Sequence, residues 1–240
     1  MLAFGPRLWR QMVFNTPQTL LNFVEALDTD KARHIRIIEL GPSVFPETSS
    51  VIMRDSQNST LVSLLTGVSA NLVDLTMIES GNTTSAMVPV IYPYQFPCLR
   101  GLVLATTHSA LSDRVCTFIK RHPSLNQIKL FPTPSSSPAT EQLAPGNDWR
   151  PDGLEIVCPL SWLPTFQRAP VQKLRLEMPP LAQNLPIRRD LIPLHLVSLC
   201  LTGEWASMLT FLDCIAVFPP EEIIIYVNED STVSTATSFA

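Results

Sequence analysis

The chain has 240 residues, of which 45% are hydrophobic and 16% charged, and its formal net charge is −4. These values are typical of an ordered, apolar chain and argue against a disordered one. The negative net charge and the absence of a block of Lys and Arg argue against nucleic-acid binding, which needs clustered cations to neutralise phosphates. The 22 prolines against 8 glycines favour short elements separated by many turns, since proline fixes φ and lacks a backbone donor.

Four helices are predicted from apolar residues that recur on one helical face. The first follows Thr16, with Pro17 as its first residue, an arrangement that favours a helix start. The others span residues 60–69, 109–121 and 205–218, and the last two are followed by proline. The apolar stripes are Leu20, Val24 and Leu27; Leu61, Leu64, Leu65 and Val68; Leu111, Val115, Phe118 and Ile119; and Met208, Leu212 and Ile215.

Short strands are predicted between these helices by a recurring pattern, apolar-x-x-apolar-x-apolar. The copies are Ile35/Ile38/Leu40, Leu72/Leu75/Met77, Leu99/Leu102/Leu104, Leu125/Ile128/Leu130, Val171/Leu174/Leu176 and Leu196/Leu199/Leu201, with weaker copies at 154–157 and 223–227. The copies that begin at residues 72, 99 and 125 are 27 and 26 residues apart. A period in this range with this pattern is typical of leucine-rich repeats.

The predicted fold is therefore α/β: a leucine-rich-repeat-like solenoid with parallel strands on the concave face and helices on the outer face. A doubly wound α/β sheet is the alternative, because it also alternates strands and helices. The solenoid is favoured since residues 125–130 and 171–176 keep polar side chains between apolar ones, so one face of these strands meets water. We expect one irregular repeat domain over residues 1–227, with loops at 80–97 and 132–151, and a disordered tail at 228–240.

Five stretches of the chain together suggest a known family: Pro-Arg-Leu-Trp-Arg at residues 6–10, Thr-Pro-Gln-Thr-Leu-Leu-Asn-Phe at 16–23, His-Ile-Arg-Ile-Ile-Glu-Leu at 34–40, and the two repeats at 96–104 and 122–130. These stretches resemble the leucine-rich-repeat regions of fungal F-box-like proteins. The resemblance covers residues 1 to about 227. It implies a substrate-recognition part of an F-box-type ubiquitin-ligase receptor, with ligase components as further partners. The F-box itself would precede Leu8 and is not in this sequence.

No catalytic motif is found, whether a nucleophile elbow, a phosphate loop or a metalloprotease helix, so we do not expect an enzyme. Cys116 and His122 are interpreted as a core thiol and a surface imidazole at a helix end, and Glu221 with Glu222 as solvated charges. Five scattered cysteines without a Cys-x-x-Cys pair argue against disulfides and zinc, so no metal or cofactor is expected. A small intracellular hydrolase or transferase remains the alternative, and a remnant without its own role is a third reading.

The absence of a signal peptide and of a long apolar stretch predicts an intracellular protein, cytoplasmic or nuclear, that does not bind membranes. We expect a monomer that binds a protein partner. Residues between the apolar strand positions should line the concave face, and those predicted to bind the partner are Gln127, Lys129, Phe131, Lys173, Arg175, Glu177 and Tyr226. Glu39, Asp74, Thr76, Ser198 and Thr202 should share this face. Phe131, Arg175 and Tyr226 are the expected anchors.

Overall fold

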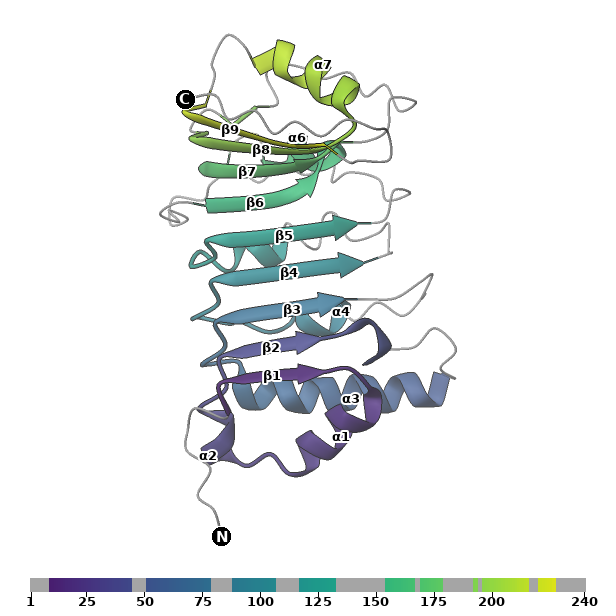
Figure 1. The fold of residues 1–240 in the computed structure, drawn as a ribbon. Coiled ribbons are helices and arrows are strands. Elements are labelled where there is room, and N and C mark those ends of the chain that lie inside the picture. Colours follow the sequence, from purple (N-terminus) through teal and green to yellow (C-terminus); the bar gives the residue numbers. More distant parts are fainter. Residues whose placement is uncertain are drawn as a thin grey trace.

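The computed structural model of the chain describes residues 9–44, 51–78, 88–106, 117–132, 154–166, 169–178, 192–193, 196–215 and 220–227. Its strands form one sheet in which every neighbouring pair is parallel and the order across the sheet follows the order along the chain (Figure 1). The strands are β1 (Gln11–Phe14), β2 (Ile37–Leu40), β3 (Asp74–Ile78), β4 (Gly101–Thr106), β5 (Gln127–Pro132), β6 (Leu154–Pro159), β7 (Val171–Glu177), β8 (Ser198–Gly203) and β9 (Glu222–Val227). The predicted α/β class with parallel strands is confirmed.

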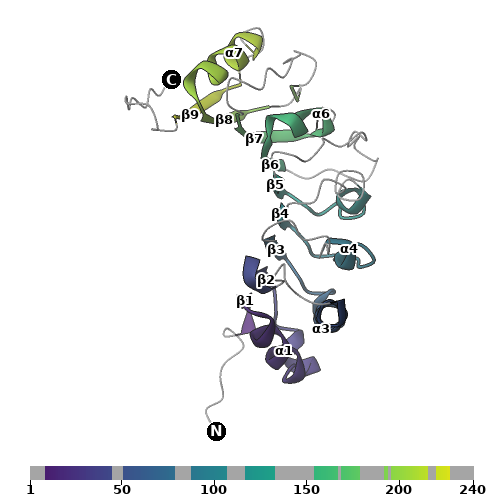
Figure 2. The same cartoon turned by 90° about the vertical axis from the view of Figure 1, so that its right-hand side faces the viewer.

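The helices lie between consecutive strands. They are α1 (Pro17–Glu25), α2 (Thr29–Ala32), α3 (Val51–Val68), α4 (Val88–Ile91), α6 (Leu163–Phe166) and α7 (Trp205–Ile215), with 3-10 turns η2 (Pro42–Val44) and η4 (Leu160–Trp162). Figure 2 shows α1, α3, α4 and α6 on one side of the sheet, which bends so that this side is the outside of the curve. We call the other side of the sheet, on the inside of the bend, the open face.

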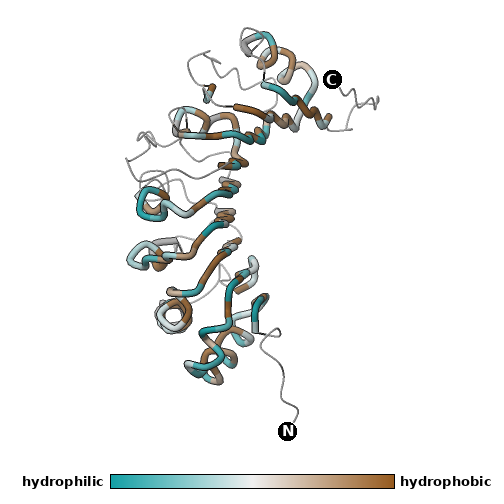
Figure 3. The backbone as a smooth tube through the Cα atoms, turned by 90° about the vertical axis from the view of Figure 1, so that its left-hand side faces the viewer, coloured by the Kyte–Doolittle hydropathy of each residue, from teal (hydrophilic) through white to brown (hydrophobic). Residues whose placement is uncertain are grey.

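The core lies between the sheet and these helices. Alternate residues of each strand point into it, for example Leu102 and Leu104 of β4 and Ile128 and Leu130 of β5, all buried. The predicted stripe of α3, Leu61, Leu64, Leu65 and Val68, is fully buried against them. Figure 3 shows the hydrophobic segments concentrated along the strands and the chain that leads into them.

Most strands begin two residues later than the apolar pattern predicts. The first apolar residue of the early copies, such as Leu72, Leu99 or Leu125, is buried in the turn before its strand. One residue stands between that apolar residue and the strand, and its backbone still forms a hydrogen bond with the neighbouring unit. Arg100 is an example: its N–H donates to Val73 O at 2.7 Å. The pattern therefore predicts a buried turn followed by a strand, rather than a strand alone.

The predicted helix start at Thr16 is confirmed as a capping box. The Thr19 N–H donates to Thr16 Oγ1 at 3.2 Å, and the Thr16 N–H donates back to Thr19 Oγ1 at 3.4 Å. The helix predicted at 60–69 is longer and begins at Val51. Of the helix predicted at 109–121, only residues 117–121 are described; 117–120 are helical and 121 is a turn residue. The tail at 228–240 and most of the predicted loops lie outside the described residues.

Two features of the sheet were not predicted. Strand β1 has no copy of the apolar pattern, yet it pairs with β2 through Val13 and Glu39. Between β6 and β7 the register shifts: Leu154 pairs with Val171 and Glu155 pairs with Lys173, so Gln172 is passed over. This extra residue lets Val171 and Leu174, three positions apart, both lie in the core.

Candidate functional site

The open face consists of rows of side chains that cross the sheet from strand to strand. Because the strands pair in register, one residue of each strand contributes to each row, with about 4.8 Å between neighbours. The middle row is Val13, Glu39, Thr76, Val103, Lys129, Val157, Arg175, Cys200 and Ile224. Among the described residues, no helix lies over this face (Figure 2).

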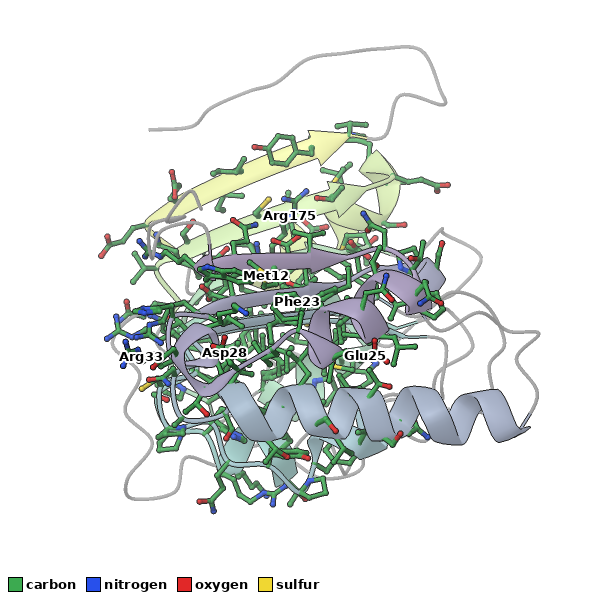
Figure 4. The ribbon with its side chains drawn as sticks, turned by 90° about the horizontal axis from the view of Figure 1, so that it is seen from below. Met12, Phe23, Glu25, Asp28, Arg33 and Arg175 are labelled. Atoms are coloured by element: carbon green, nitrogen blue, oxygen red, sulfur yellow. The ribbon has the colours of Figure 1, made fainter. Side chains whose placement is uncertain are left out.

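The residues predicted to bind a partner all come from three strands of this face. They are Gln127, Lys129 and Phe131 of β5, Lys173, Arg175 and Glu177 of β7, and Tyr226 of β9. The three β7 residues and Tyr226 are exposed, and those of β5 are half-buried. Figure 4 shows Arg175 on the side of the sheet away from α3. The five further predicted positions, Glu39, Asp74, Thr76, Ser198 and Thr202, occupy the same face in their strands.

Arg175 and Tyr226 form the best-defined contact of the open face. The guanidinium carbon of Arg175 lies 5.6 Å from the centre of the Tyr226 ring, a cation–π contact that crosses β8. Burial raises the pKa of the Cys200 thiol beside them above its ordinary value, although the charge of Arg175 acts in the opposite direction. Cys200 is therefore a neutral thiol at pH 7, and Arg175 presents its charge toward the ring and the solvent.

The three cations predicted to form a basic spot share this surface with acids. Lys129 and Arg175 lie on either side of Val157 in the middle row, and Lys173 stands opposite Glu155 in the register of β6 and β7. The Gln127 side chain also donates to Glu155, at 3.0 Å. Val157 is only 5% exposed although it belongs to the open face. The surface is therefore an apolar floor between charges of both signs, rather than a purely basic spot.

Apolar side chains continue along the open face at both ends of the sheet. Val13 of β1, Ile78 of β3, and Ile224 and Tyr226 of β9 are among the most exposed large hydrophobic residues of the described chain. Single exposed apolar residues are common on protein surfaces, but these share one face with Arg175 and Phe131. Such a mixture of aromatic, aliphatic and arginine side chains is typical of protein interfaces.

The surface position predicted for His122 is wrong. Its imidazole is 1% exposed, its Nε2 accepts from the Phe96 N–H at 3.0 Å, and its Nδ1 lies 2.7 Å from Phe118 O. These two bonds fix the tautomer with the proton on Nδ1. Burial lowers the pKa of His122 below its ordinary value, so the ring is neutral at pH 7. Cys116, which was interpreted together with His122, lies outside the described residues.

A group of arginines was missed in the sequence. Arg10, Arg36 and Arg100 each stand directly before a strand, at the edge of the sheet where β1 to β4 begin, and they line a cavity of about 680 Å³. The pattern that could have identified them is an arginine immediately before the strand in three of the first four units. We call this cavity the edge pocket. It lies on a different part of the sheet from Arg175 and Tyr226.

Other kinds of site find less support among the described residues. No group of three or more His, Cys, Asp or Glu side chains there is placed to hold a metal ion. No helix in the described part of the chain is both long and apolar enough to cross a bilayer. The strand order from β1 to β9 does not reverse, so these strands lack the switch point at which doubly wound enzymes bind their ligands.

Comparisons with protein-family models, with curated proteins and with solved structures find no match to this chain. The proposals for its function therefore rest on the geometry of the open face and of the edge pocket.

Proposed function

We propose that the chain is an irregular leucine-rich-repeat-like solenoid that binds a protein partner across its open face. The observation that carries the proposal is the unequal covering of the sheet. Parallel sheets in α/β enzymes have helices on both faces, whereas the described helices of this chain lie on one face (Figure 2). The uncovered face presents exposed aromatic, aliphatic and charged side chains in registered rows.

The strongest contacts with the partner are proposed at β7 to β9. Tyr226 is 53% exposed and is held by Arg175, so both side chains are partly ordered before binding. Tyr and Arg are enriched among residues whose truncation weakens interfaces by 2 kcal/mol or more. Phe131 on β5 offers the partner a second aromatic side chain. The buried Val157 of β6 is the apolar surface between Phe131 and the pair formed by Arg175 and Tyr226.

The surrounding charges favour one orientation of the partner. Lys129, Lys173 and Arg175 attract acidic groups, while Glu155 and Glu177 repel them. An acidic side chain of the partner would therefore lie between the cations of β5 and β7, above Val157. The resemblance to F-box-like repeat regions supports the more specific proposal that this partner is a substrate of a ubiquitin ligase.

Affinity purification with mass spectrometry tests the proposal on four forms of the full chain: wild type, Arg175→Ala, Tyr226→Ala and Val62→Ala. Val62 is an exposed apolar residue of α3, so Val62→Ala is the matched control on the opposite side of the sheet. We expect at least one protein whose direct binding to the purified chain is weakened roughly tenfold or more by either open-face variant and is unchanged by Val62→Ala.

Two outcomes would overturn the proposal. In one, no protein binds the wild-type chain directly. In the other, the bound proteins are lost equally in the control and in the open-face variants. Thermal unfolding of each variant shows that it is folded. Recovery of ligase adaptor and scaffold subunits with the wild type, through a longer form or a bound partner, would support the link to ubiquitin ligases.

A further inference from the structure

The edge pocket lies where the first four strands begin, at a distance from the proposed partner surface. A hydrogen-bond ladder sets its geometry: Val73 N donates to Arg36 O at 2.7 Å and Arg36 N donates to Arg10 O at 2.9 Å. Arg100 continues the ladder on the next strand, with its N–H bonded to Val73 O at 2.7 Å. The backbones of Arg10 and Arg100 are thus three strand spacings apart, about 14 Å, and their long side chains can converge on a group between them. Figure 4 shows this edge beside the labelled Arg33.

Among the described residues, no ion pair neutralises the positive charge of the pocket. In the described part of the chain the ion pairs join Lys31 to Asp28 and Arg33 to Asp30, so Arg10, Arg36 and Arg100 are left without a carboxylate within 4.0 Å. The Arg36 Nη1 atom donates to the carbonyl oxygens of Arg33, Ile35 and Asn71, which fixes the side chain but leaves its charge. Three guanidinium groups in one cavity are unusual in a chain whose formal net charge is −4.

Asp74 is the carboxylate that faces these arginines. It is half-buried in the wall of the pocket, and its carboxylate lies so close to Gly101 that a Cβ there would meet Oδ1. Burial raises the pKa of Asp74 above its ordinary value, and the charges of Arg10 and Arg100 act to lower it. One carboxylate cannot neutralise three guanidinium groups, so the pocket keeps a net positive charge at pH 7.

We infer that the edge pocket binds a multiply charged oxyanion, and that a phosphate group is its best ligand. A phosphate presents several acceptor oxygens in different directions, so the guanidinium groups of Arg10, before β1, and Arg100, before β4, can each donate to it in pairs. The cavity of about 680 Å³ has room for the group that carries the phosphate as well. Asp74 sets the strength of binding, because its charge opposes that of the ligand.

Thermal unfolding and calorimetric titration of the full chain test this site, with inorganic phosphate as the probe and chloride controls of equal ionic strength. We expect a saturable stabilisation of the wild type by phosphate. Arg10→Ala and Arg100→Ala should each weaken binding about tenfold. Asp74→Asn should strengthen it about fivefold, since it removes the opposing charge without changing the size of the side chain.

Arg121→Ala is the matched control, because it removes an exposed arginine that lines neither the edge pocket nor the open face, and it should leave phosphate binding unchanged. A second titration with O-phosphoserine distinguishes free phosphate from a phosphorylated side chain: tighter binding than that of phosphate identifies a modified peptide, and equal binding identifies the free anion. Equal binding by the wild type and the Arg10→Ala/Arg100→Ala double variant, or no saturable effect of either probe, would overturn the inference. Because neither arginine lies on the open face, these results are independent of the partner tests above.

Discussion

The two ends of the sheet have the same pattern of backbone hydrogen bonds but place their arginine and lysine side chains differently. In β1 to β4 the charged side chains of the open face are the acids Glu39 and Asp74, and the arginines stand at the edge before the strands. In β5 to β9 the edge position is Asn126 before β5, and the long side chains, Lys129 and Arg175 among them, stand on the open face.

This difference shows that the position of a residue within the repeated unit decides which surface it serves. A residue one place before the strand reaches the edge, and in most strands a residue at the first, third or fifth place reaches the open face, while the second and fourth places lie in the core. Since neighbouring units are in register, a residue type that recurs at one of these places builds a continuous surface from segments about 26 residues apart. The chain thereby separates the proposed anion pocket from the proposed partner surface within one sheet.

The largest expected effect compares the cores of the two ends. Phe96, in the turn before β4, and Phe166, at the end of α6, are both fully buried. Phe96→Ala and Phe166→Ala should each lower the free energy of unfolding by about 3–5 kcal/mol, because each leaves a cavity. Chemical denaturation measures both. A loss below 1 kcal/mol at either position would contradict the packing described for that end.

The next largest effect compares the stability cost of a Gly→Ala substitution at one glycine from each end of the sheet. Gly203 has a φ of +151°, and a Cβ there would lie 3.0 Å from the backbone oxygen of Met178, so Gly203→Ala should cost about 2–3 kcal/mol. At Gly101 the obstacle is the Asp74 side chain, which can rotate, and Gly101→Ala should cost only about 1 kcal/mol.

The double variants separate these two causes. Asp74→Ala should remove the cost of Gly101→Ala, whereas Met178→Ala should leave most of the cost of Gly203→Ala, because the backbone conformation is unchanged. Denaturation midpoints of the single and double variants provide the measurement. An equal cost of Gly101→Ala with and without Asp74 would contradict the contact between them.

A smaller effect is expected from pH, through His122. Burial lowers the pKa of His122 in the folded protein, so the unfolded chain binds the proton more readily. Stability contributed by the neutral ring is complete above the ordinary histidine pKa of about 6.5 and is lost as the pH falls from there toward the folded-state value. His122→Gln should therefore lose less stability than the wild type between about pH 7.5 and pH 5.5. Equal losses in urea denaturation at the two pH values would contradict the buried, neutral imidazole.

The smallest effect expected is the coupling between Arg175 and Tyr226. A double-mutant cycle of Arg175→Ala and Tyr226→Ala should give about 0.5 kcal/mol of interaction free energy in the unbound chain, as exposed cation–π pairs do. The same cycle at Lys129 and Tyr226 is the control and should give none, because β5 and β9 are four strand spacings apart, about 19 Å, beyond the reach of the two side chains. A coupling of zero at the first pair would show that these side chains are not ordered before a partner binds.

The sequence predicts the parallel sheet well because its signal repeats. Ile128 and Leu130 are recognisable as core positions through the matching residues of five other copies. Strand β1 was missed because it has a single short alternation, Met12 and Phe14, and gains its place only by pairing with β2. His122 was assigned to the surface as an imidazole at a helix C-terminus, although it occupies the place of Phe96 in the preceding unit and its ring lies tilted against that of Phe96, 5.7 Å between the ring centres. The edge pocket was missed because its arginines are far apart in sequence and meet only through the register of the strands.

The register shift between β6 and β7 accommodates one extra residue without changing the face of any side chain that follows. Side chains on a strand alternate with a period of two, and Lys173 and Arg175 continue the rows of Glu155 and Val157 because Gln172 is passed over. Removal of Gln172 would join Val171 to Lys173 and leave a regular alternation. Deletion of Gln172, whose side chain is exposed to solvent, should consequently be far better tolerated than a one-residue deletion inside a regular strand such as β5, which would move every later side chain of that strand to the other face.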